Sequence, residues 1–290
     1  VTDLNTYLGS ATKLDDLSDA KSEGDNFTYS LIIGHETTGT LSTATYNTAV
    51  GLTALDAITS GDYNTAIGYD ALTAHTSGSA NTAMGYRALY QATSGNNTAF
   101  GARSLYTNTT GNQNTAVGVY SLYDNTTGKD NTAVGTVSMD DNTTGDSNTA
   151  IGISSLRKNT TGDYNTASGA DALLWNTTAS YNTASGYRAL YANTTGTRNI
   201  AIGYGAYDAA DTENDNLAIG YDALGGAIAG GEYNVAIGNY TLDANTTGDY
   251  NVAVGYNALT TNTGGYRNTA SGYYALYANT DGAFNTASGF

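Results

Sequence analysis

Residues 148–164 read Asn-Thr-Ala-Ile-Gly-Ile-Ser-Ser-Leu-Arg-Lys-Asn-Thr-Thr-Gly-Asp-Tyr, and the chain repeats this unit with small changes along most of its length. The first five residues follow the pattern Asn-x-Ala-x-Gly, which occurs fifteen times. The asparagines that open the copies are Asn47, Asn64, Asn81, Asn97, Asn114, Asn131, Asn148, Asn165, Asn182, Asn199, Asn216, Asn234, Asn251, Asn268 and Asn285. Consecutive copies are 17 residues apart, except for a spacing of 16 before Asn97 and of 18 before Asn234. A fixed period of this length is the signature of a repeat architecture, in which each unit packs on its neighbours.

Variation between the copies indicates where each side chain points, with positions counted from the opening asparagine as position 1. Position 3 is Ala and position 5 is Gly in every copy, while position 9 is Leu except at Met139 and Tyr207. Positions 2 and 4 accept Thr, Ser and apolar residues, so they share one face of a strand, along which side chains alternate. We expect the invariant Ala to face neighbouring backbone, and the invariant Gly to occupy a positive φ or a tight corner.

The unit predicts an all-β fold, a parallel β-solenoid or β-roll of about fifteen 17-residue coils. Thr, Asn and Gly are poor helix formers, and Asn-Thr-Thr-Gly is typical of a polar turn. Each coil is expected to hold two short strands, one at Asn-x-Ala-x-Gly and one around the leucine at position 9. Successive coils then stack in parallel about 4.8 Å apart, so that identical side chains form ladders of Asn, Thr, Leu and Tyr.

The start of the repeat divides the chain into three segments. Residues 1–25 carry no repeat and much charge, and they are predicted to form an arm or linker. Residues 26–45 are predicted to cap the first coil, because 27–33 is the most apolar strand and open solenoid ends invite edge pairing. The repeat solenoid is predicted over 46–290, and its last coil, which has no recognisable cap, is expected to meet more chain or another subunit.

Composition excludes several classes of partner and chemistry. The 290 residues include 36 Gly and 25 Tyr but no Pro and no Cys, and the net charge is −16. The lack of cysteine removes disulfides and thiolate metal sites. The acidic charge argues against nucleic acid, which is bound by neutralising phosphates with basic residues, and against anionic membrane surfaces. No apolar run of about 20 residues is present, so no membrane insertion is predicted.

Catalytic patterns are missing from the sequence. The two histidines, His35 and His75, lie outside any paired metal-ligand spacing, and neither a Gly-x-Ser-x-Gly elbow nor a phosphate loop occurs. Aspartates fall mostly at turn positions, which indicates solvated loops instead of a catalytic carboxylate pair. We therefore predict no enzymatic activity and no cofactor. Calcium stays open because Gly-Asp pairs weakly resemble calcium-binding repeats; ordinary turn aspartates are the alternative.

Tyrosines at position 6 form a candidate stripe for binding a glycan or a partner chain, and a purely structural ladder is the alternative. They are Tyr69, Tyr86, Tyr187, Tyr204, Tyr221, Tyr256 and Tyr273. Tyrosine also recurs at positions 10 and 17. Asn-Thr-Thr sequons are candidate glycosylation sites in a eukaryotic secreted protein; a turn in which Asn and Thr cap backbone groups is the alternative. The sequons begin at Asn108, Asn125, Asn142, Asn159, Asn176, Asn193 and Asn245.

Four copies of the motif resemble the head repeats of trimeric autotransporter adhesins. They read Asn-Ile-Ala-Ile-Gly at 199–203, Asn-Leu-Ala-Ile-Gly at 216–220, Asn-Val-Ala-Ile-Gly at 234–238 and Asn-Val-Ala-Val-Gly at 251–255. The longer unit with its Asn-Thr-Thr-Gly turn is similar to repeats of phage tail-fibre proteins, as is the lead-in Leu-Asp-Asp-Leu-Ser-Asp-Ala-Lys at 14–21. The resemblance covers about residues 14–290. It implies a β-roll with three chains side by side, in a fibre that is extracellular or on a virion surface.

Three functions compete at this point. The first is a structural shaft of a tail fibre or surface appendage, built as a homotrimer. The second is an adhesin whose repeats bind a host glycan or protein. The third is an extracellular filament of protomers joined end to end. A tyrosine stripe buried between chains favours the shaft, and a stripe that faces solvent favours the adhesin.

Overall fold

Each copy of the Asn-x-Ala-x-Gly motif forms one three-residue strand, at positions 2 to 4 of its coil. The structure, a computed structural model, describes residues 20–21, 30–33, 43–226 and 230–290. The chain divides into two units, residues 1–130 and 131–290. The strands of the first unit are β1 (Ala20–Lys21), β2 (Leu31–Ile33), β3 (Thr48–Val50), β4 (Thr65–Ile67), β5 (Thr82–Met84), β6 (Thr98–Phe100) and β7 (Thr115–Val117). Those of the second are β8 (Thr132–Val134), β9 (Thr149–Ile151), β10 (Thr166–Ser168), β11 (Thr183–Ser185), β12 (Ile200–Ile202), β13 (Leu217–Ile219), β14 (Val235–Ile237), β15 (Val252–Val254), β16 (Thr269–Ser271) and β17 (Thr286–Ser288).

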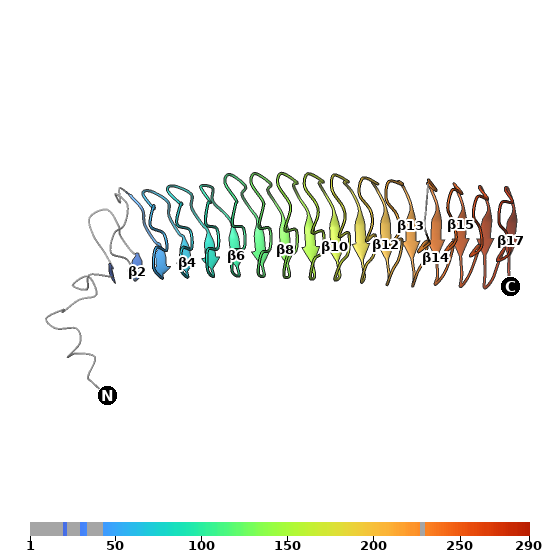
Figure 1. Cartoon of the computed structure of the whole chain (residues 1–290), viewed down its shortest axis with the longest axis horizontal. Helices are drawn as coiled ribbons and strands as arrows, with labels where there is room; N and C mark the ends of the chain where they lie inside the picture. The colour runs from blue at the N-terminus through green and yellow to red at the C-terminus, as the bar shows by residue number, and fades with distance from the viewer. Residues whose placement is uncertain (1–19, 22–29, 34–42, 227–229) are drawn as a thin grey trace, which may run out of the picture. The chain divides into compact units, whose positions relative to one another are not determined.

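Within each unit, successive motif strands pair in parallel and in chain order (Figure 1). Equivalent residues lie opposite one another, as Ala167 of β10 does with Ala184 of β11. The register also holds across the longer spacing, where Ala218 faces Ala236, so the extra residue falls outside the strands. The described residues contain no helix. The predicted all-β parallel β-solenoid, with one coil per repeat, is therefore confirmed.

The second strand predicted around position 9 is wrong. The leucines there have a left-handed backbone, with φ 50° at Leu156 and 52° at Leu173, and Ser154 at position 7 has φ 56°. The Leu156 N–H nevertheless donates to the Ala172 carbonyl of the next coil at 2.9 Å. This side of the coil is therefore hydrogen-bonded between coils as a strand would be, but its left-handed residues bend it into a turn. A left-handed residue other than Gly costs about 1–2 kcal/mol, which burial of the leucine side chain offsets.

The interior of each coil is narrow and is filled mainly by small side chains. The Ala at position 3 is fully buried, as at Ala150, Ala167 and Ala184, and it lies directly against its equivalents in the coils before and after. Leucine at position 9 supplies most of the larger buried side chains, including Leu156 and Leu173. The predicted inward direction of the invariant Ala is confirmed, and positions 2 and 4 point outward.

Replacing Ala167 with leucine is expected to lower the free energy of unfolding by about 1–3 kcal/mol, because three extra carbons would be forced into a filled interior. The same change at Thr178, which is exposed at position 14 of the same coil, is the matched control and should stay within about 0.5 kcal/mol. Thermal unfolding followed by circular dichroism compares the two variants. Equal melting temperatures would show that the coil interior is not filled at position 3.

Buried asparagines hold consecutive coils together through their side chains. At position 1, the Asn165 N–H donates to Asn148 Oδ1 at 2.9 Å, and Asn165 Nδ2 donates to the Ala179 carbonyl at 2.8 Å. Both asparagine side chains are fully buried. The same contacts recur one period later at Asn182. The opening asparagines thus pair buried backbone groups that small apolar side chains would leave without a hydrogen bond.

The N-terminal edge of the first unit is covered by a short antiparallel pairing. Ala20 and Lys21 of β1 lie opposite Ile33 and Ile32 of β2. Strand β1 falls in the segment predicted as an arm, and β2, in the predicted capping region, is the first parallel strand. Since a paired strand no longer offers free backbone groups, β1 protects this edge. Residues 27–29, which were part of the predicted capping strand, lie outside the described residues.

Candidate interaction surfaces

The outward face of the strands carries no charge. Residues at positions 2 and 4 point away from the coil interior in both units, and none of them is charged in any of the fifteen coils, although the chain holds 10 basic and 26 acidic residues. At position 2 they are Thr48, Thr65, Thr82, Thr98, Thr115, Thr132, Thr149, Thr166, Thr183, Ile200, Leu217, Val235, Val252, Thr269 and Thr286. At position 4 they are Val50, Ile67, Met84, Phe100, Val117, Val134, Ile151, Ser168, Ser185, Ile202, Ile219, Ile237, Val254, Ser271 and Ser288. We call this surface the strand face.

The strand face of the second unit is most apolar over β12 to β15. Both outward positions are aliphatic in these four strands, and Ile200, Ile202, Val252 and Val254 are 39–41% exposed. The strands on either side of this block, β10, β11, β16 and β17, carry Thr and Ser instead. A contiguous apolar patch bordered by polar residues is typical of a protein–protein contact.

The tyrosines predicted as a stripe at position 6 are exposed, and neighbouring ones stack. In the first unit, the ring centroids of Tyr69 and Tyr86 are 5.8 Å apart. In the second unit, the separations are 5.2 Å for Tyr187–Tyr204, 5.0 Å for Tyr204–Tyr221 and 5.2 Å for Tyr256–Tyr273. The row is interrupted by Asn239, where Tyr240 from position 7 contacts both Tyr221 and Tyr256 edge-on. The structure thus brings the predicted residues together within each unit.

Stacking decides which parts of these rings are open to a ligand. Tyr204 has the Tyr221 ring stacked on one side at an interplanar angle of 4° and the Tyr187 ring tilted by 32° on the other, so its faces are partly covered while its edge and hydroxyl are open to solvent. Sugars bound by aromatic residues lie against ring faces. Inner rings therefore fit the structural-ladder alternative, while hydrogen bonding through the hydroxyls stays open.

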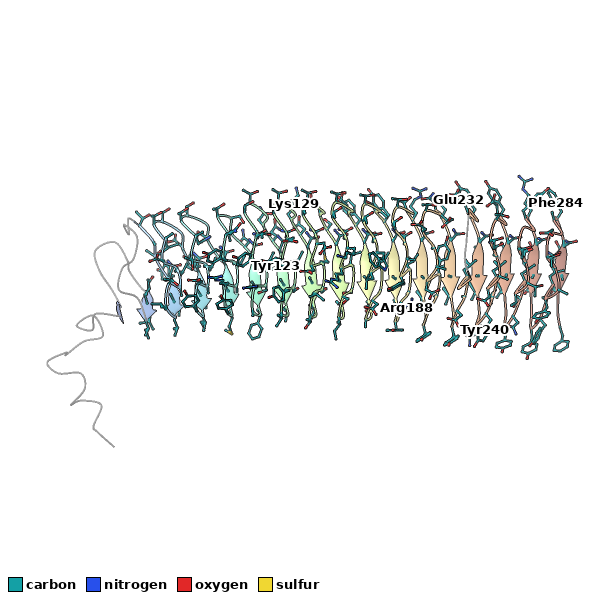
Figure 2. The ribbon with its side chains drawn as sticks, in the orientation of Figure 1. Tyr123, Lys129, Arg188, Glu232, Tyr240 and Phe284 are labelled. Carbon is teal, nitrogen blue, oxygen red and sulfur yellow. The ribbon has the colours of Figure 1, made fainter. Side chains whose placement is uncertain are left out.

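Tyrosines that directly precede the next opening asparagine, at position 17 of a 17-residue coil, form pairs that were not among the predicted site residues. The ring centroids are 4.9 Å apart in Tyr46–Tyr63, 5.2 Å in Tyr164–Tyr181 and 4.9 Å in Tyr233–Tyr250, with interplanar angles of 3°, 7° and 2°. In the second unit, Glu232 and Phe284, from positions 16 and 17, lie along one edge of the coils, and Arg188 and Tyr240, from position 7, lie along the other (Figure 2). The recurrence of Tyr at position 17 was visible in the sequence, but the pairing of its rings depends on how the coils stack.

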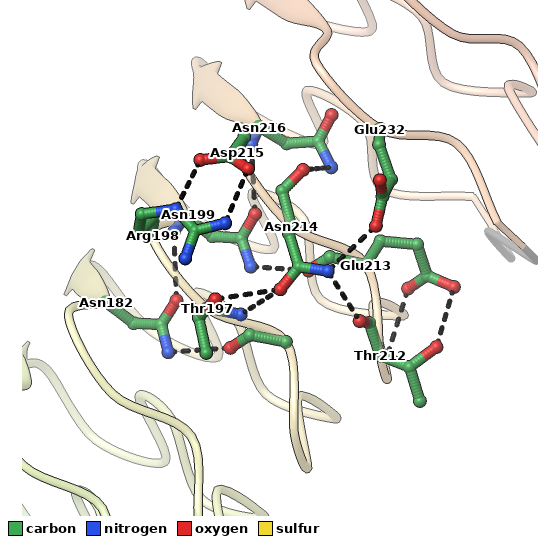
Figure 3. A network of polar contacts seen from close by, with 11 residues as sticks. Asn182, Thr197, Arg198, Asn199, Thr212, Glu213, Asn214, Asp215, Asn216 and Glu232 are labelled. Atoms are coloured by element: carbon green, nitrogen blue, oxygen red, sulfur yellow. Dashed lines mark hydrogen bonds and ion pairs between the residues drawn. The ribbon is translucent and has the colours of Figure 1, made fainter.

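A polar network takes the place of tyrosine at position 17 between Tyr181 and Tyr233 (Figure 3). Arg198 donates from Nε and Nη2 to the Asp215 carboxylate at 2.6 and 2.8 Å, and these bonds lower the pKa of Asp215. Beside this pair, Asn214 Nδ2 donates to Glu232 at 2.8 Å. The partners lie 17 or 18 residues apart, so the network joins consecutive coils and acts as part of the stack.

Three residues of the coil that begins at Asn199 depart from the interior pattern: Tyr207, Ala210 and Glu213. Tyr207 replaces the leucine of position 9; its buried hydroxyl accepts a hydrogen bond from Asn216 Nδ2 at 2.6 Å, and burial raises the pKa of the phenol. Glu213, 4% exposed, accepts the N–H groups of the two preceding residues at 3.1 Å. Ala210 stands where other coils have a buried asparagine, and Asn193 Oδ1 in the coil before has no hydrogen-bond partner. These buried polar groups serve coil packing and are closed to a substrate.

The asparagines of the predicted sequons are fully buried. Asn159 Nδ2 donates to Asn142 Oδ1 at 2.8 Å and to the Gly162 carbonyl at 3.0 Å, and Asn176 repeats the pattern one coil later. A glycan would be attached at this nitrogen, so its attachment would require the coil to open and both hydrogen bonds to break. The geometry corresponds to the alternative prediction, a turn in which Asn caps backbone groups.

Three aspartates of the second unit lie close enough to influence one another. Burial raises the pKa of Asp208, Asp222 and Asp243, and at Asp208 the charges of the other two add to the effect while Arg188 opposes it. In the part of the chain that the structure describes, no group of three or more His, Cys, Asp or Glu side chains is arranged to hold a metal ion. Calcium binding and the absence of enzymatic activity both stay predictions.

Of the two histidines, His75 belongs to no cluster of possible metal ligands among the described residues. His75 is fully buried, where Nδ1 lies 3.1 Å from the Ala92 carbonyl and Nε2 lies 2.6 Å from the Gly78 carbonyl, and burial lowers its pKa. It occupies position 12, so it substitutes for a buried asparagine. His35 lies outside the described residues.

Comparison with known proteins does not place this chain in a family. The described stretches contain no apolar helix of membrane-spanning length. The chain matches no protein-family model, and no curated protein is significantly similar to it. The surfaces of the repeat are therefore the basis for inferring its role.

Proposed function

We propose that this chain is a structural component of an extracellular or virion-surface fibre, in which copies associate side by side through the strand face as a homotrimer. In this role it acts as the shaft of a tail fibre or surface appendage, which spaces or mediates attachment. The observation that carries the proposal is the uncharged strand face of a strongly acidic chain. Copies with a net charge of −16 repel one another, and an uncharged face that meets its equivalent keeps carboxylates out of the contact.

The arrangement of the coils supports the same role. Each coil bonds to its neighbours through backbone hydrogen bonds, buried asparagines and stacked tyrosines, for example Thr149 N–H to the Asn165 carbonyl at 2.8 Å. Stability in such an array accumulates from contacts between neighbouring repeats. Side chains with chemical reactivity serve this packing, as Tyr207 and Glu213 do, which suits a structural protein better than an enzyme.

Replacing Ile237 with aspartate is expected to convert the oligomer into a folded monomer, because association would bury an unpaired charge from every copy at a cost of several kcal/mol each. Ile237 lies on the strand face in β14. Thr247→Asp is the matched control, since Thr247 is exposed at position 14 of the same coil, away from the strand. Light scattering measures mass, and circular dichroism confirms that both variants keep their β structure.

The outcomes separate the competing assemblies. A trimer in the native protein and in Thr247→Asp, with a monomer in Ile237→Asp, supports side-by-side association. Polymers that are indifferent to both substitutions would instead indicate end-to-end association through terminal coils. A monodisperse native monomer at micromolar concentration would overturn the proposal.

An adhesin that binds glycan through the repeats is the second candidate. It is favoured by the exposed hydroxyl edges at position 6, as in Tyr204, which is 51% exposed. If the repeats themselves bind glycan, binding should persist in the Ile237→Asp monomer, whereas a shaft would bind none.

A further inference from the structure

The three tyrosine pairs at position 17 share one geometry. All six residues have a left-handed backbone, with φ between 56° and 65°. The two rings of a pair therefore have nearly the same orientation and differ mainly by a shift from one coil to the next. This explains the small interplanar angles of 2–7°. The rings are 46–61% exposed, so their edges are open to reagents in solution.

The composition directs oxidation toward these residues. The chain has 25 Tyr but no Cys, two Met and one Trp. One of the methionines, Met139, is fully buried. Thiols and thioethers, which normally react with oxidants first, are thus scarce, and exposed phenols are the abundant oxidisable groups.

We propose that Tyr46–Tyr63, Tyr164–Tyr181 and Tyr233–Tyr250 are sites of oxidative coupling to dityrosine, formed by a peroxidase-type one-electron oxidant that consumes hydrogen peroxide. Each phenol of a pair loses one electron and one proton and becomes a tyrosyl radical. The two radicals join through a new carbon–carbon bond between ring carbons ortho to the oxygens. The hydrogen on each of those carbons then moves to its oxygen, which restores both phenols. The two electrons and two protons reduce one hydrogen peroxide to two waters.

Proximity favours coupling within a pair. Holding two reactive groups as neighbours makes their reaction effectively unimolecular, and centroid separations of 4.9–5.2 Å place each radical next to its partner. The rings must swing about their side-chain bonds to join edge to edge, which their exposure permits. Tyrosines at position 10, such as Tyr90 and Tyr106, also stack but are half-buried, so they have less freedom to rotate.

A coupled pair would staple two consecutive coils. The linked residues are 17 apart in the chain, so each bond closes a loop of that length, as a disulfide would in a chain that contained cysteine. In the second unit, position 17 lies at the opposite coil edge from position 7 (Figure 2). The staple would therefore form along the coil edge that carries Glu232 and Phe284.

The test treats the folded protein with a haem peroxidase and hydrogen peroxide and follows the blue dityrosine fluorescence. Peptide mass spectrometry should then find the three pairs joined, each with the loss of two hydrogens, and the melting temperature should rise. A mixture of unlabelled and ¹⁵N-labelled chains distinguishes coupling within a chain, which we expect, from coupling between chains.

Phenylalanine variants supply the controls, because they keep the stack and remove the phenol. The triple variant Tyr46→Phe, Tyr164→Phe and Tyr233→Phe should lose the three cross-linked peptides, and its dityrosine fluorescence and its rise in melting temperature should be smaller than those of the native protein. Stacked tyrosines at position 6, such as Tyr204 and Tyr221, keep their phenols in this variant. The matched triple Tyr191→Phe, Tyr240→Phe and Tyr266→Phe removes tyrosines for which the structure gives no face-to-face tyrosine partner, and it should couple as the native protein does. Equal signals in the two variants, or cross-links only between chains, would overturn the proposal. Neither outcome depends on whether the chain forms trimers.

Discussion

Replacing Gly152 with alanine is expected to lower the free energy of unfolding by about 2–6 kcal/mol, the sum of backbone strain and overpacking. Gly152, at position 5, has φ +134°, a conformation that residues with a side chain rarely adopt. A Cβ there would lie 2.5 Å from the Gly169 carbonyl oxygen and 2.6 Å from its carbon. Neither atom can move aside, because both belong to the backbone of the next coil. Thermal and urea unfolding of the variant measure the loss.

Gly264→Ala is the matched control. Gly264 lies at position 14, where most coils have Thr, and its φ is not in the strained range. A Cβ there would meet only side-chain oxygens, Asp281 Oδ1 at 3.0 Å and Thr247 Oγ1 at 3.4 Å, which are free to shift. The variant should be as stable as the native protein or slightly more so, because alanine reduces the freedom of the unfolded chain. If both variants melt together, the close approach of consecutive coils at position 5 is not what fixes glycine there.

Replacing Asn165 with leucine is expected to cost about 2–4 kcal/mol, although leucine has nearly the same shape. The Asn182 N–H, which donates to Asn165 Oδ1 at 3.0 Å, would be left unpaired inside the coil, and an unpaired buried donor costs about 1–3 kcal/mol. The bond from Asn165 Nδ2 to the Ala179 carbonyl at 2.8 Å would also be lost. The unfolding midpoint in urea is the measurement.

The same substitution at an exposed position tests whether burial causes the loss. Asn239 is exposed at position 6, and its Oδ1 accepts the Tyr221 N–H at 3.0 Å. Asn239→Leu should change stability by no more than about 0.5 kcal/mol, since water can replace that acceptor. A similar loss in both variants would mean that leucine itself, and not the missing hydrogen bonds, destabilises the solenoid.

Parts of the candidate surfaces were predictable, and parts were not. The tyrosines at position 6 could be found from the sequence because one residue type recurs at a fixed period. That the Tyr187 and Tyr221 rings partly cover the faces of Tyr204 follows only from the way the coils stack. The buried state of Asn159 was equally hidden, since Asn-Thr-Thr-Gly has the composition of an ordinary exposed turn.

The sequence by itself determined the period, the parallel stacking of coils, the inward Ala and the strained Gly. Each of these follows from a local rule: a residue confined to Ala or Gly reports a lack of space, and a period of 17 places equivalent residues in register. Only the tertiary structure decided the backbone conformation around position 9. Local preference disfavours a left-handed leucine at Leu156, so the sequence suggested a second strand there. Burial against the neighbouring leucines and the hydrogen bond to the Ala172 carbonyl outweigh that preference, and both exist only once the next coil is in place.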